Sequence, residues 1–110
     1  MEFIITIFYF HGGNDIDHRI FGKNQTENRV NEDIRIFPAG GLTKGKGIHE
    51  KYLKINIKNN NDFNLELLSD VLVHKLSSID DADSLKIGNN KVELNKNEIK
   101  KALRIHLNEI

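Results

Sequence analysis

Four side chains of this sequence are of the types that a metal-independent ribonuclease uses. They are His11, His18, Lys46 and His49. In such a site one histidine takes a proton from a 2′-hydroxyl, another protonates the leaving group, and a lysine stabilises the charge at phosphorus. Nothing in the spacing brings the four residues together. Scattered surface histidines explain the pattern better, so the ribonuclease is kept as a second hypothesis.

Two other patterns resemble ligand sites but are incomplete. Residues 40–47 match Gly-x4-Gly-Lys, but Gly47 occupies the position of the serine or threonine that holds Mg²⁺ in a phosphate-binding loop. Histidines and aspartates near the N-terminus could ligate a metal, yet they match no established ligand spacing: His11, Asp15, Asp17 and His18. The absence of cysteine excludes thiolate sites and cysteine nucleophiles. We therefore predict no catalytic residue, no metal and no cofactor.

Acidic side chains form the candidate binding site. One group lies in a single predicted loop and consists of Asp80, Asp81 and Asp83. The other lies nearer the N-terminus and consists of Glu27, Glu32 and Asp33. An acidic surface attracts a basic partner, and charge steering raises the association rate. If the partner is a nuclease with a basic active site, these carboxylates are the predicted inhibitory contacts. The simpler explanation is that they are solvated turn residues.

The length and composition of the chain indicate one domain of residues 1–110, which is long enough for a modest hydrophobic core. Lys plus Arg and Asp plus Glu are 16 each, so the formal net charge is zero. A protein dedicated to nucleic acid usually has a basic excess, so we expect no direct nucleic-acid binding. The apolar N-terminus lacks the basic region and small-residue cleavage site of a signal peptide. We expect a cytoplasmic protein that does not enter a membrane.

The element that should organise the fold is Glu2–Phe10. It is apolar at every position from Phe3 to Phe10 except Thr6, and it is rich in β-branched and aromatic residues. A half-buried strand would alternate apolar and polar residues. The unbroken run therefore predicts a central strand that is covered on both faces.

Residues 11–50 are polar and contain seven of the eight glycines. Within them Ile34–Phe37 is typical of a short strand that ends at Pro38, because proline cannot donate to a ladder. The segment is otherwise predicted to be rich in loops. Long loops are often functional, so it is the expected partner-binding surface.

The second half has regular periodicity. Tyr52–Lys58 alternates as a strand with one wet face, and Phe63–Ile79 has the apolar spacing of a helix after an asparagine-rich cap. Asn89 and Asn90 predict a hairpin turn that pairs Ile87 with Val92 and Leu85 with Leu94. Asn95, with Glu98 three residues later, predicts the cap of a last helix.

These elements predict an α+β fold. A mixed or mainly antiparallel sheet has Glu2–Phe10 at its centre, two helices pack on one face, and a C-terminal hairpin leads into the last helix. The leading functional hypothesis is a cytosolic immunity or antitoxin protein that occludes the active site of a cognate toxin encoded nearby. Small size, incomplete catalytic motifs, the loop-rich segment and a composition rich in Asn, Lys and Ile motivate it. An inhibitor of a host protein, encoded by a phage or plasmid, is the remaining alternative.

Overall fold

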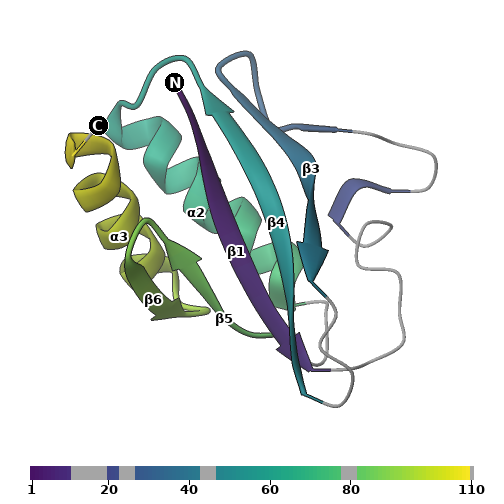
Figure 1. The fold of residues 1–110 in the computed structure, drawn as a ribbon. Coiled ribbons are helices and arrows are strands. Elements are labelled where there is room, and N and C mark those ends of the chain that lie inside the picture. Colours follow the sequence, from purple (N-terminus) through teal and green to yellow (C-terminus); the bar gives the residue numbers. More distant parts are fainter. Residues whose placement is uncertain (11–19, 23–26, 43–46, 78–81, 110) are drawn as a thin grey trace.

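Within the residues that it describes, a computed structural model has a six-stranded sheet and two long helices (Figure 1). It describes residues 1–10, 20–22, 27–42, 47–77 and 82–109. The strands are β1 (Glu2–Phe10), β2 (Asn28–Arg29), β3 (Ile34–Leu42), β4 (Ile48–Ile57), β5 (Ala82–Ile87) and β6 (Asn90–Glu93). The helices are α2 (Asp62–Ser77) and α3 (Lys96–Glu109).

The strands lie in the order β2-β3-β4-β1-β5-β6, and every neighbouring pair is antiparallel. β1 is central, and the β5–β6 hairpin leads directly into α3. In Figure 1 both helices lie behind the sheet, and the face turned toward the viewer carries neither. The predicted α+β architecture is confirmed.

The alternate residues of β1 differ in burial between the two faces of the sheet. Phe3, Ile5 and Ile7 are buried, and the ring of Phe3 meets His106 of α3 edge-on with 5.3 Å between ring centroids. Ile4 and Phe10 point the other way and are 47% and 49% exposed. The prediction that β1 is covered on both faces is wrong, because α2 and α3 pack on the same side of the sheet.

The core lies between the sheet and the helices. Alternate strand residues meet the apolar faces of α2 and α3, because side chains repeat every two residues along a strand and about every 3.6 along a helix. The fully buried members include Ile5, Ile7, Ile34, Ile36, Leu53, Ile55, Leu68, Leu72, Leu76, Leu85 and Ile87. Ile20 and Phe21 add to the same core from the segment before β2.

The described part of residues 11–50 is more regular than predicted. It contains β2, β3 and the start of β4. β3 also does not end at Pro38 but continues to Leu42, with a register irregularity between Pro38 and Gly41. Among the described residues, β2 pairs only with Arg35 and Ile36, so none of them pairs with Pro38 on that side, and proline is tolerated where its missing N–H is not needed for a ladder.

Two helix caps are set by local sequence, as predicted. The Asn61 side chain accepts a hydrogen bond from the backbone N–H of Asn64 (2.8 Å) at the start of α2. Asn95 accepts from the N–H groups of Asn97 (2.9 Å) and Glu98 (3.1 Å) at the start of α3. Such side chains satisfy the backbone donors that a first helical turn leaves without partners.

The hairpin forms, but its predicted turn is wrong. Gly88 and Asn89 form the turn, so Ile87 pairs with Asn90 and Leu85 with Val92. Gly88 has φ +60°, and a Cβ built on it would lie 2.6 Å from Nδ1 of His106. Glycine is needed at this position for the left-handed backbone and for the close approach of α3. The two-residue shift keeps the same side chains on the helix side.

Candidate binding face of the sheet

The candidate site is the sheet face turned away from α2 and α3, here called the open face. It consists of alternate residues of five antiparallel strands, which lie in cross-strand rows. These residues are Arg35, Phe37 and Leu42 of β3; Ile48, Glu50, Tyr52, Lys54 and Asn56 of β4; Glu2, Ile4, Thr6, Phe8 and Phe10 of β1; Ser84 and Lys86 of β5; and Lys91 and Glu93 of β6.

Apolar and aromatic side chains run along β1 and its neighbours on the open face. Ile4 and Phe10 of β1 are about half exposed, and Phe8 of the same strand is partly exposed. Tyr52 lies opposite Thr6 and Phe37 lies beside Lys54 on the neighbouring strands. Exposed apolar groups that adjoin one another, unlike single ones, mark interaction surfaces on soluble proteins.

Two lysines lie over aromatic rings of this face. The Nζ of Lys54 is 5.0 Å from the ring centroid of Phe37, and the Nζ of Lys91 is 4.8 Å from that of Phe8. A cation over a ring face is attracted by the ring quadrupole, with about 0.5–1 kcal/mol at exposed sites. The lysine stems also cover part of the apolar surface.

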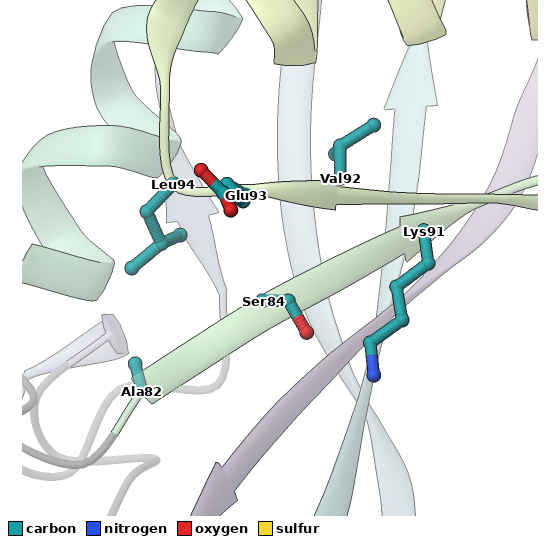
Figure 2. A pocket seen from close by; sticks show the side chains of 6 residues that line it. All are labelled: Ala82, Ser84, Lys91, Val92, Glu93 and Leu94. Carbon is teal, nitrogen blue, oxygen red and sulfur yellow. The ribbon is translucent and has the colours of Figure 1, made fainter.

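Lys86 and Lys91 are direct cross-strand partners in the hairpin. Both belong to the open face, and like charges directly opposite each other destabilise a sheet. Figure 2 shows the side chains of Lys91 and Ser84 directed to one side of the hairpin and Val92 directed to the other, toward the helices. A shallow pocket is lined there by Ala82, Ser84, Lys91, Val92, Glu93 and Leu94.

Carboxylates lie toward the two ends of the face. Glu2 accepts a hydrogen bond from the side-chain amide of Asn56 (3.2 Å). At the other end, the hydroxyl of Tyr52 donates to Glu50 (3.3 Å), and Glu93 is paired with Ser84 in the hairpin. Desolvation, followed by the charge of Glu50 and this hydrogen bond, raises the pKa of Tyr52. Tyr52 is therefore a neutral hydrogen-bond donor at physiological pH.

The acidic residues predicted as contacts do not form one cluster among the described side chains. Glu32 and Asp33 precede β3, whose Ile34 pairs with Ile57 near the start of β1. Asp83 belongs to β5, where Ala82 pairs with Tyr9 at the opposite end of β1.

Asp33 has a structural role at its end of the sheet. Its carboxylate accepts a hydrogen bond from the side chain of Asn64 (3.0 Å). Glu27, just before β2, is half-buried, and Glu32 is exposed. Asp80, Asp81 and the side chain of Asp83 lie outside the described residues. The role of all six as partner contacts stays a prediction.

His49 is the only proposed ribonuclease residue within the described part of the chain. It is 2% exposed, on the helix side of β4, and its ring lies 5.3 Å from that of Tyr9 at an angle of 30°. His11, His18 and Lys46 lie outside the described residues, so their convergence stays untested. Among the residues that are described, no three histidines, aspartates or glutamates are grouped to hold a metal ion.

Sequence reasoning missed the open face as a site. The wet side of Tyr52–Lys58 contained part of the signal, because aromatic and lysine residues alternate with buried ones there. Its other members come from strands far apart in sequence, and only the strand register brings Phe8, Lys54 and Lys91 onto one surface.

Comparisons with models of protein families, with curated proteins and with solved structures find no match. Neither of the described helices is both long and apolar enough to cross a membrane.

Proposed function

We propose that this protein binds another protein through the open face and acts by occluding it. The observation that supports the proposal is the exposure of Ile4 and Phe10 on the central strand of the sheet. On its other face, the same strand has the almost fully buried side chains of Phe3, Ile5 and Ile7. Burying exposed apolar groups of the central strand against a partner is favourable, because it removes them from water.

The composition of the face supports a protein partner. Aromatic side chains dominate the binding free energy of many interfaces, and Phe8, Phe37 and Tyr52 lie within reach of the same surface. Charged and polar groups surround the apolar middle, as in the rim of an interface. The sheet is also a rigid support, and a preorganised surface loses less conformational entropy on binding.

In its most concrete form, the proposal is a cytoplasmic immunity or antitoxin protein. The partner is then a toxin encoded by the neighbouring gene, whose active site the bound protein covers. Such an inhibitor needs only a complementary surface and no catalytic residues. An inhibitor of a host protein, encoded by a phage or plasmid, would use the same surface physics with a different partner.

The test is co-expression with the product of the adjacent gene, followed by affinity purification and a growth-rescue assay. Wild type should form a stoichiometric complex and restore growth. Ile4→Glu should weaken the complex at least about tenfold, which corresponds to ~1.4 kcal/mol, because it places a charge in the apolar middle of the interface.

Ile105→Glu is the matched control. It introduces the same change at an isoleucine that is 40% exposed on α3, in the helix layer of the protein. Equal binding by both variants and wild type would exclude the open face as the interface. A neighbour that is not toxic and does not bind would remove the immunity hypothesis. RNA cleavage by the purified protein, lost in a folded His49→Ala variant, would then support the ribonuclease.

A further inference from the structure

We propose that the open face recognises an acidic surface of its protein partner, in which carboxylates surround apolar side chains. This inference rests on the proposed function and specifies the partner's chemistry. It differs from the expectation drawn from sequence, in which acidic residues of this protein meet a basic active site. The cationic and apolar residues of the two central rows carry the argument.

The first central row crosses the sheet from β3 to β1 and contains Phe37, Lys54 and Ile4. The second runs from β4 to β6 through Tyr52, Thr6, Lys86 and Lys91. Neither row contains a carboxylate. The carboxylates of the face are those of Glu2, Glu50 and Glu93 in the flanking rows. The middle of the open face is therefore cationic and apolar, although the whole chain has no net charge.

The lysines of these rows form no ion pair with any residue that the structure describes. Lys54 and Lys91 instead lie over the aromatic rings of Phe37 and Phe8. A ring attracts a cation less strongly than a carboxylate does when both are removed from water. A partner carboxylate would therefore bind these ammonium groups more favourably than Phe37 and Phe8 do.

The Lys86–Lys91 pair adds a second argument. Repulsion between directly opposed lysines lowers the stability of the free hairpin. A carboxylate placed between the two ammonium groups would remove this repulsion and add charge-assisted hydrogen bonds. Relief of the Lys86–Lys91 repulsion would thus contribute to the free energy of binding.

The flanking carboxylates favour a protein over single-stranded nucleic acid. Glu2, Glu50 and Glu93 would repel a phosphate backbone that crossed the face. Ile4 offers an aliphatic surface, which suits an apolar side chain of a protein better than a stacked base. A protein surface can place carboxylates over the central lysines and polar or basic groups over the flanking glutamates.

Amide NMR of the ¹⁵N-labelled full-length protein tests the inference without a known partner. The protein is titrated with a short peptide in which glutamates alternate with leucines and phenylalanines, and with a matched peptide that has lysine at every glutamate. The acidic peptide should shift amides of β1, β4 and β5 on the open face. Its affinity should exceed that of the basic peptide roughly tenfold and fall as salt is added.

Two charge-reversal variants control the assignment. Lys86→Glu/Lys91→Glu should lose the preference for the acidic peptide, whereas Lys101→Glu, at an exposed lysine of α3, should keep it. A preference for the basic peptide, equal shifts by both peptides or no shift by either would overturn the acidic-partner inference. Stronger shifts by oligothymidine would overturn it in favour of nucleic acid.

Failure of this inference and failure of the proposed function give different results. If the adjacent gene product binds wild type, not Ile4→Glu, and tolerates the double lysine reversal, the open face is the interface but the partner's surface is not acidic. If Ile4→Glu binds like wild type, the proposed interface itself is wrong.

Discussion

The surface between the two helices and the open face of the sheet differ in how their charged side chains are paired. Between α2 and α3, Lys96 pairs with Glu66 (2.9 Å) and Asp70 (3.1 Å). Lys100 pairs with Glu66 (3.0 Å) and Asp62 (3.3 Å), and Arg104 also pairs with Asp62. On the open face, lysines lie over aromatic rings or opposite each other. The charges between the helices are thus paired within the fold, whereas the central lysines of the open face form no ion pair with a described residue.

The difference also applies to apolar groups. Most apolar residues of the helices point into the core, where Leu68, Leu72 and Leu103 are nearly or fully buried; Phe63 of α2 and Ile105 of α3 are the exposed exceptions. β1 is apolar on both sides but is covered on one. A strand with more apolar surface than its own fold covers points to an external partner.

The largest expected effect comes from changing adjacent isoleucines of β1. Ile5→Ala should lower the free energy of unfolding by about 2–5 kcal/mol, because Ile5 is fully buried and the change leaves a cavity. Ile4→Ala should cost less than ~1 kcal/mol, because Ile4 is about half exposed on the open face. Urea denaturation of both variants measures the difference. Equal losses would mean that the two faces of β1 are equally covered.

The next largest effect concerns the turn that fixes the hairpin against α3. Gly88→Ala should destabilise the protein by about 1–3 kcal/mol, because alanine is strained at φ +60° and its Cβ would overlap the ring of His106. Thermal unfolding measures the loss. Asn89→Ala is the control, at an exposed residue of the same turn. A Gly88→Ala variant as stable as wild type would contradict the tight packing of turn and helix.

How much of this could be predicted from sequence depends on the range of the interactions. The Asn61 and Asn95 caps and the hairpin-to-helix unit were predictable, because residues close in the chain determine them. The central position of β1 followed from its apolar run. Three features depend on distant packing and were predicted wrongly: the covered faces of β1, the end of β3 at Pro38 and the turn at Gly88.

The open face was beyond prediction for the same reason. In the sequence of its own strand, each of its lysines is typical of a solvent-exposed residue. Lys54 and Lys91 belong to different hairpins, and only the pairing of β1 with both β4 and β5 puts them on one surface. The pairing of strands distant in sequence thus creates the site.

A smaller effect is expected from acid on the helix surface. The pKa of Asp62 is lowered, mainly by a hydrogen bond from Arg104. The pKa of Glu66 is also lowered, mainly by a hydrogen bond from Lys96. A carboxyl with a lower pKa in the folded state stabilises the fold above its unfolded pKa and loses this contribution as pH falls through its folded pKa. The stability of wild type should therefore fall as pH is lowered from about 5 to about 3.

Glu66→Gln should lose less stability than wild type over that pH range, because it lacks one of these carboxyls. Glu93→Gln on the open face is the matched control, since no ion pair to a described residue holds Glu93 there. Thermal midpoints across the pH range give the comparison. If Glu66→Gln and Glu93→Gln follow wild type equally, the helix ion pairs do not contribute to stability.

The smallest expected effect separates stability from function on the open face. Lys86→Glu converts the repulsive Lys86–Lys91 pair into an attractive one and should stabilise the protein by roughly 0.2–1 kcal/mol. The gain should shrink at high salt, because the charges are exposed and screened. The same variant should bind an acidic partner less tightly. Lys86→Gln, which removes the repulsion without adding an attraction, should fall between the two in stability. A Lys86→Glu variant that is less stable than wild type at low salt would show that the two lysines do not repel each other in the free protein, and would remove the second argument for an acidic partner.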